Sequence, residues 1–217
     1  MKLWKGLFFC MWMADKPLTQ QRLARDLADL LNVLRGRANF CGFVQAFWST
    51  LAREWSGIDA LRMDKFLYLV RCYVNQGFEC IAKQQWSDQT LLEDYLKALE
   101  EVPFNYRNDK IPNGLRYHVI EIYVDELDKV DAKRNAPVDT IIEPMRDLGR
   151  LSHNKTVKQR VEEALDDHRL KDWQGEGVEA REDASEPLDA QPKGGKLPDP
   201  QRNDGGDDND DFAGFED

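Results

Sequence analysis

Residues 60–84, ALRMDKFLYLVRCYVNQGFECIAKQ, decide the fold of this chain. Their apolar side chains recur at helical spacing over a wide arc, which is typical of a helix buried on most of its circumference. The arc consists of Met63, Phe66, Leu67, Leu69, Val70, Tyr73, Val74, Cys80 and Ile81. We therefore expect the central helix of the core here, with other helices packed around it.

Helical patterns continue on both sides of this segment, and no strand-like alternation persists for more than a few residues. Expected helices lie at 3–14, from Pro17 onward, at 38–55, from Ser87 onward, from an Asn113 cap onward, at 138–151 with an interruption at Pro144, and at 154–170. Asp59, after a short break at 56–59, is the expected N-cap of the central helix. The sequence predicts an all-α protein whose antiparallel helices form a bundle or an α-solenoid of stacked pairs.

Charge is spread unevenly along the 217 residues, which carry 30 Lys and Arg against 40 Asp and Glu. Residues 1–84 have a net charge of +5, residues 85–171 of −4, and residues 172–217 of −11. The last segment also has few aliphatic side chains, too few to offset the entropy lost on ordering. We therefore expect a helical scaffold domain at 1–171 and a disordered acidic tail at 172–217. The near-neutral domain lacks the dense positive charge of a protein dedicated to nucleic acid.

The first expected helix is apolar on every side. Lys5 interrupts the run and no small-residue cleavage site follows, which argues against a secretion signal. The run is also far shorter than the roughly 20 residues that span a bilayer. We expect either that further residues precede this helix or that a partner covers an apolar surface on it. That surface would consist of Trp4, Leu7, Phe8 and Trp12.

Cysteines and histidines show no spacing typical of a metal or redox site. Each cysteine falls in an apolar helical pattern, so we expect free, buried thiols in a reducing compartment. These residues are Cys10, Cys41, Cys72 and Cys80. No phosphate-binding glycine loop or hydrolase motif occurs, so the sequence predicts no cofactor and no enzyme activity.

Two carboxylates, Glu54 and Glu126, fall on apolar helix faces. A buried carboxylate needs a cationic or hydrogen-bonding partner. Arg62, in the first turn of the next helix, is the expected partner of Glu54 in a structural ion pair. The alternative is that the two acids form an acid–base pair in a catalytic pocket.

Basic side chains in the first 84 residues are candidate contacts to RNA or to a partner protein. They are Lys2, Lys5, Lys16, Arg35, Arg37, Arg53 and Lys65. The alternative is that they are ordinary solvated residues, and a net charge of +5 does not favour tight independent RNA binding.

Three segments carry a family resemblance. They are Trp4-Lys5-Gly6-Leu7-Phe8-Phe9-Cys10-Met11-Trp12-Met13 followed by Asp15-Lys16-Pro17-Leu18; Phe47-Trp48 with Arg53-Glu54-Trp55-Ser56-Gly57-Ile58-Asp59 and Arg62-Met63-Asp64-Lys65-Phe66; and Pro112-Asn113-Gly114-Leu115 with His118, Ile120-Glu121-Ile122-Tyr123 and Glu126-Leu127. Over residues 3–130, and weakly over 131–171, the chain resembles the nucleolar ribosomal RNA-processing protein 1 family.

The resemblance implies a HEAT-like helical scaffold in the nucleus and nucleolus. Such a protein assists assembly of the pre-60S particle, without catalysis, and is needed for maturation of the RNA around the second internal transcribed spacer. The implied partners are assembly factors, including Brix-domain and WD-propeller proteins, and pre-ribosomal RNA in peripheral contact; no membrane or small-molecule substrate is implied. Two alternatives stay open, an RNA-processing hydrolase that uses Glu54 and Glu126 and a generic peptide-binding α-solenoid.

Overall fold

A computed structural model of the chain describes residues 2–174, and this part is helical with no strand. Its helices are α1 (Lys2–Met13), α2 (Pro17–Val33), α3 (Arg37–Glu54), α4 (Ala60–Ala82), α5 (Gln89–Glu101), α6 (Asn113–Val130), α7 (Val138–Leu151), α8 (Lys155–Leu165) and α9 (Arg169–Trp173), with a 3₁₀ turn at Trp55–Gly57. The predicted all-α class is confirmed. The expected disordered tail lies, from residue 175 onward, outside the described residues, and the expected boundary at residue 171 stays a prediction.

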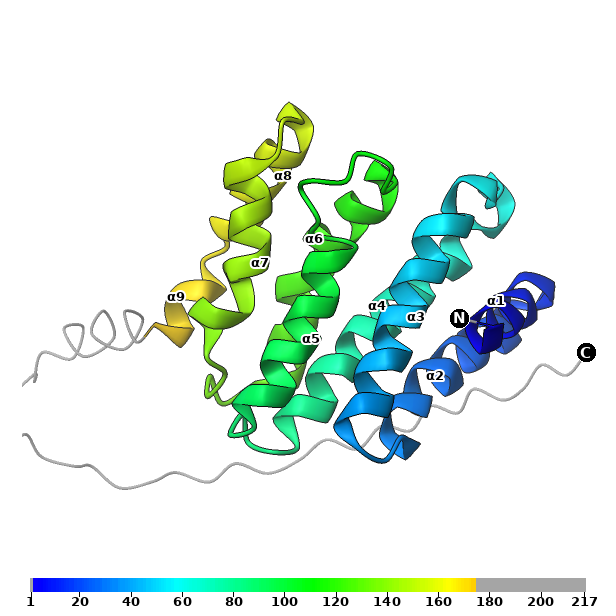
Figure 1. Ribbon diagram of the computed structural model, residues 1–217, viewed down its shortest axis with the longest axis horizontal. Helices are drawn as coiled ribbons and strands as arrows, with labels where there is room; N and C mark the ends of the chain where they lie inside the picture. The colour runs from blue at the N-terminus through cyan, green and yellow to red at the C-terminus, as the bar shows by residue number, and fades with distance from the viewer. Residues whose placement is uncertain (1, 175–217) are drawn as a thin grey trace, which may run out of the picture. The chain divides into compact units, whose positions relative to one another are not determined.

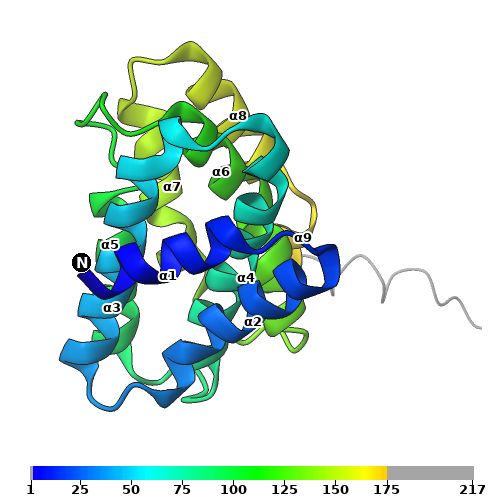
Figure 2. The ribbon, with the colours of Figure 1, turned by 90° about the vertical axis from the view of Figure 1, so that its right-hand side faces the viewer.

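The helices stack in two layers (Figure 1). One layer contains α2, α4, α6 and α8 in succession, and the other contains α3, α5 and α7. The first helix, α1, runs across α3 and α4 at one end of the stack (Figure 2). The last pair, α7 and α8, forms the opposite end (Figure 1).

The central position of α4 is confirmed. This helix packs against α1, α2, α5 and α6. Its fully buried apolar residues include Phe66, Leu69, Val70, Tyr73, Val74, Phe78 and Ile81. The side chains that form the wide arc in the sequence therefore meet neighbours on several sides, which is why this segment organises the core.

Three helices, α4, α5 and α8, begin at a side-chain cap. The side chain of Asp59 accepts a hydrogen bond from the backbone N–H of Arg62 at 3.1 Å, so the predicted cap of α4 is confirmed. The predicted cap at Asn113 is wrong, because α6 begins at that residue and Pro112 precedes it. The helix expected from Ser87 begins at Gln89, with the Asp88 side chain as its cap.

Two predictions about the last helices are wrong. α7 continues through Pro144 without interruption, held by buried neighbours such as Met145 that pack its apolar side on the core. The segment expected as one helix at 154–170 is divided, because α8 ends at Leu165 and α9 begins at Arg169.

Candidate functional site

The predicted basic contacts do not form one patch. Arg37 begins α3 and Arg53 lies near its other end, roughly 24 Å away along the helix axis. Arg37 forms an ion pair with Asp94 of α5 at 3.0 Å, and Arg53 forms one with Glu54 at 2.8 Å. The remaining exposed members of the set are Lys2, Lys5, Lys16 and Arg35. Contact with RNA or a partner through these residues stays a prediction.

The prediction that Lys65 contacts RNA or a partner protein is wrong. The side chain is buried, and its Nζ donates hydrogen bonds to the backbone carbonyls of Trp12 and Ala14, each at 2.7 Å. These carbonyls belong to the C-terminal end of α1, where backbone acceptors lack intrahelical partners and a cation is favourable. Lys65 therefore fastens α1 to α4 and is not a surface contact.

The predicted ion pair between Glu54 and Arg62 is also wrong. Glu54 is only half-buried and pairs with Arg53, as described above. Arg62 instead forms an ion pair with Asp59, the cap of its own helix, and its guanidinium lies 4.9 Å from the centre of the Trp12 ring. Both residues therefore pair with an oppositely charged side chain close in sequence, and not with each other across the two helices.

Glu126 is buried, as its place on an apolar face predicts. Its Oε1 accepts from Nη1 of Arg71 and from Nζ of Lys129, each at 2.7 Å. The two cations are the partners that a desolvated carboxylate needs. They hold Glu126 in a structural link between α4 and α6.

Other side chains with catalytic potential are engaged in packing or in backbone contacts. Nε2 of His118 lies 2.9 Å from the carbonyl oxygen of Leu67, and burial lowers the pKa of this imidazole. Burial also raises the pKa of the Cys72 and Cys80 thiols, which keeps them protonated and poorly nucleophilic at neutral pH. Cys10 is exposed, so the prediction that every cysteine is buried is wrong.

The apolar surface predicted on α1 faces inward for the most part. Trp4 and Phe8 are 1% and 2% exposed. The Trp4 ring packs on Phe43 and Phe47 of α3, and the Phe8 ring stacks on Phe66 of α4. The other two predicted members, Leu7 and Trp12, are partly buried against the same core. The chain therefore covers Trp4 and Phe8 by itself, which corrects the expectation of a partner there.

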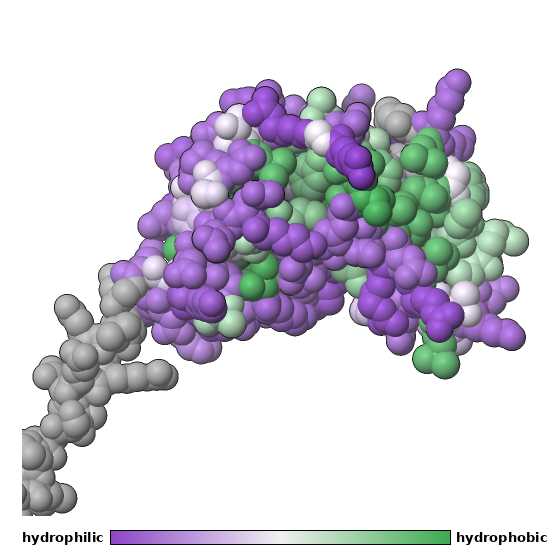
Figure 3. Space-filling view, turned by 90° about the horizontal axis from the view of Figure 1, so that it is seen from below, coloured by the Kyte–Doolittle hydropathy of each residue, from purple (hydrophilic) through white to green (hydrophobic). Residues whose placement is uncertain are grey.

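The opposite side of α1, here called the outer face, was missed by the sequence analysis. It carries Leu3, Gly6, Phe9, Cys10 and Met13, all exposed. Figure 3 shows apolar surface gathered toward the side of the molecule that holds α1 and α2, and mainly hydrophilic surface toward α8 and α9. Because α1 is apolar all round, periodicity in the sequence gave no means to tell its buried side from its exposed side.

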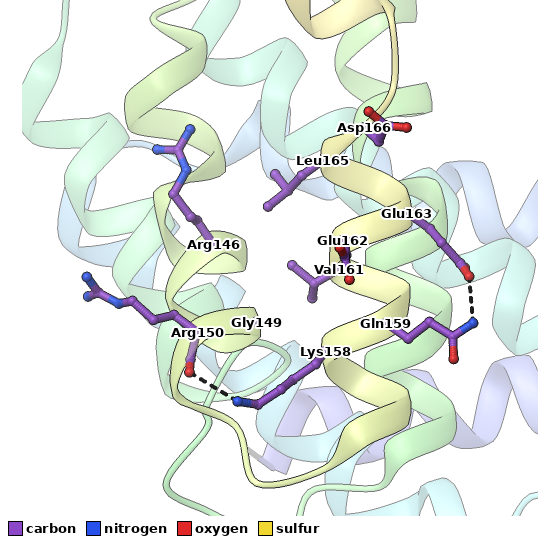
Figure 4. Close-up of a pocket in the computed structure, with 10 residues that line it drawn as sticks. All are labelled: Arg146, Gly149, Arg150, Lys158, Gln159, Val161, Glu162, Glu163, Leu165 and Asp166. Carbon is purple, nitrogen blue, oxygen red and sulfur yellow. Dashed lines mark hydrogen bonds between the residues drawn. The ribbon is translucent and has the colours of Figure 1, made fainter.

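At the other end of the stack, an open groove of about 870 Å³ lies between α7 and α8 (Figure 4). Val161 and Leu165 of α8 point toward α7 and form its apolar floor (Figure 4). Charged and amide side chains form its rim: Arg146, Arg150, Lys158, Gln159, Glu162, Glu163 and Asp166. Lys158 Nζ donates to the backbone carbonyl of Arg150 at 3.4 Å, which links the two helices across the groove.

The described part of the chain holds neither a metal-binding cluster nor a membrane-spanning helix. Among residues 2–174, no group of three or more His, Cys, Asp and Glu side chains is placed to hold a metal ion. Within the same residues, no helix is both long enough and apolar enough to cross a bilayer.

The family model for the nucleolar protein Nop52 matches residues 1–205, which is nearly the whole chain. The chain belongs to the Nop52 family. The prediction of the ribosomal RNA-processing protein 1 family is thereby confirmed, since the similar curated proteins carry that name.

Two human relatives, ribosomal RNA processing protein 1 homologs A and B, are each 41% identical over 133 residues, which is 61% of this chain. The matched region makes up 28% of homolog A and 17% of homolog B. A Caenorhabditis elegans homolog is 34% identical over 149 residues, or 68% of this chain and 37% of its own length. The chain thus spans well under half the length of these relatives.

Proposed function

We propose that this chain is the helical core of a nucleolar assembly factor that acts in ribosome biogenesis, within the pre-60S particle, as a scaffold rather than a catalyst. The observation that carries the proposal is the match of residues 1–205 to a family of nucleolar proteins whose relatives are named for ribosomal RNA processing. Its role in processing of the RNA around the second internal transcribed spacer would be indirect, through correct assembly of the particle.

The side-chain chemistry supports a scaffold. Glu126 is neutralised by Arg71 and Lys129, and His118 is bonded to a backbone carbonyl. Groups held in this way have their charge or hydrogen-bonding capacity taken up by contacts that support helix packing. The two layers of stacked helices instead offer long, rigid surfaces, which suit a protein that holds other macromolecules in place.

Partners follow from the same proposal. Pre-ribosomal RNA would make peripheral contact with exposed cations such as Lys16 and Arg35, because the helical part has little net positive charge. Brix-domain and WD-propeller assembly factors would bind the helix faces, and the location would be the nucleolus.

The test is immunoprecipitation of the tagged full chain from growing cells. We expect enrichment of precursor RNA of the large subunit together with large-subunit assembly factors. Precipitates that lack both, from cells in which the chain is expressed and folded, would contradict the proposal.

A second measurement separates a scaffold from a hydrolase. Purified protein should leave a transcript that spans the spacer intact. Cleavage that disappears in the Glu54→Gln, Glu126→Gln double variant would instead favour an enzyme. Because each acid lies in an ion pair, unfolding of the variant must be excluded by circular dichroism.

A further inference from the structure

The outer face of α1 has the shape of a helix-docking surface. The exposed fractions are 63% for Leu3, 47% for Phe9 and 72% for Met13, which are large values for apolar side chains. Between them, Gly6 carries no side chain, and the space above it is open, because a Cβ built there would meet no atom within 4 Å. Gly6, Phe9, Cys10 and Met13 stand at positions i, i+3, i+4 and i+7, which form the four-residue hole that receives one side chain of a facing helix.

The charges around this face indicate the kind of helix that fits. α1 contains no acidic residue, and Lys2 and Lys5 are exposed on the Phe9 side of the face. Lys16 follows in the turn to α2. A facing helix with acidic residues along its margin is therefore attracted, whereas one with basic residues is repelled.

A comparison with the α7–α8 end of the stack also indicates that the outer face of α1 is a contact surface. A helical unit of a stack that faces solvent normally has a polar outer surface. The α7–α8 end has one, since the rim of its groove is charged. The α1 end exposes apolar side chains in its place, and such a surface is normally covered in the working assembly.

A second copy of the chain fits this face less well. Two α1 helices would bring Lys2 and Lys5 of both copies to one interface without an acidic residue from either helix. The nearest acid in sequence is Asp15, beyond the end of α1. Charge complementarity therefore favours a different protein.

We propose that the outer face of α1 docks an amphipathic α-helix of a partner protein whose apolar side is bordered by acidic residues. One side chain of that helix enters the hole bounded by Gly6, Phe9, Cys10 and Met13, and its acidic margin lies beside Lys2 and Lys5. A helix of 12 residues offers less than the roughly 800 Å² per partner of a standard interface, so we expect this contact alone to be weak.

The test uses the full chain and two synthetic helical peptides with the same leucine face, one with Glu and one with Lys at the margins. Fluorescence anisotropy should show that the Glu peptide binds at least tenfold more tightly than the Lys peptide. Met13→Glu should weaken binding of the Glu peptide at least tenfold. The double variant Lys2→Glu, Lys5→Glu should reverse the preference toward the Lys peptide.

A matched control is Val33→Glu, which places the same charge on an apolar residue of similar exposure, 69%, at the far end of α2. It should leave binding unchanged, and all variants should unfold at the temperature of the parent chain. Failure of both peptides to bind, equal binding of both, or binding insensitive to Met13→Glu would overturn the proposal.

Analytical ultracentrifugation of the chain alone completes the test. A dimer that is lost in Met13→Glu would show that the occupant is a second copy, which also overturns the proposal, whereas a monomer supports it. None of these measurements involves ribosomal RNA, so their outcome is independent of the proposed function.

Discussion

The two ends of the helical stack differ in the side chains that they expose to solvent. Each end has one side against the core and one side toward solvent. At the α1 end the buried side is apolar, with Trp4, and the solvent side also exposes apolar residues such as Met13, beside Lys2 and Lys5. At the α7–α8 end the buried side is apolar while the solvent side carries charges, as in the rim from Arg146 to Asp166. The α7–α8 end therefore has a polar surface that is stable in water, whereas the α1 end is suited to contact another macromolecule.

The largest expected effect tests the buried side of α1. Trp4→Ala removes a ring that packs on Phe43, Phe47 and Tyr73, and it should lower the free energy of unfolding by about 3–5 kcal/mol. Urea unfolding followed by circular dichroism measures the change. Phe9→Ala, on the outer face of the same helix, is the control and should change stability by no more than about 0.5 kcal/mol. Equal losses in the two variants would mean that α1 is not oriented as described.

The same substitution should act in opposite directions at the two ends. A Cβ on Gly149 of α7 would lie 2.6 Å from Cγ1 of Val161, a stiff β-branched side chain on α8, so Gly149→Ala should cost about 1–3 kcal/mol. Gly6→Ala meets no atom within 4 Å and should stabilise the chain by about 0.5–1 kcal/mol, because alanine favours helix interiors. Thermal unfolding of both variants measures the contrast. A loss of stability in Gly6→Ala would mean that the outer face is already covered.

The stability contributed by the two ends should also depend differently on salt concentration. Arg169 of α9 donates hydrogen bonds to Asp167, to Asp125 at 2.8 Å and to Asp128 at 3.3 Å, which fastens α9 to α6. Because these groups are partly exposed, Arg169→Ala should cost about 1 kcal/mol. The loss should shrink in 1 M salt, where the screening length falls to about 3 Å. The loss in Trp4→Ala, in contrast, should persist at high salt; a salt-independent loss in Arg169→Ala would contradict an electrostatic origin.

Local sequence rules account for where the helices lie and for some of their ends. The bounds expected for α7, residues 138–151, agree with the structure, and Asp59 caps α4 as predicted. Both depend on residues within a few positions of one another, so periodicity and capping chemistry suffice. The burial of Glu126 follows from its helix face in the same way, although its partner Arg71, on another helix, was not foreseen.

The candidate site was harder to predict because it depends on how helices are rotated against one another. Glu54 and Arg62 both lie near the core, yet each found a partner closer along the chain. Lys65 has the same charge as the surface lysines, but its place on the inward side of α4 directs it to the end of α1. In α1 itself, uniform hydrophobicity concealed which side is exposed.

The smallest expected effect concerns Glu100, at the surface where α5 meets α7. Burial, then the charge of Asp147, and then that of Glu101 raise the pKa of Glu100. A carboxyl whose pKa is higher in the folded chain binds more protons there than in the unfolded chain, so its contribution to stability falls as pH rises through the unfolded and then the folded pKa. The penalty is absent in acid, below the ordinary pKa of a glutamic acid, and fully present at neutral pH.

Glu100→Gln should therefore raise the unfolding temperature slightly at pH 7 and leave it nearly unchanged at pH 3.5. The carboxylate charge that the variant removes is present at pH 7 and absent in acid. Glu143→Gln, on the exposed side of α7, is the matched control: Glu143 forms an ion pair with Arg146 at 2.6 Å, so its loss should lower the unfolding temperature at pH 7. A lower unfolding temperature for Glu100→Gln at pH 7 would show that this carboxylate stabilises the junction of α5 and α7. The charges at the α7–α8 end would then stabilise the folded chain at the contact of α5 with α7 as well as along the groove rim. The contrast with the apolar α1 end would be larger than described.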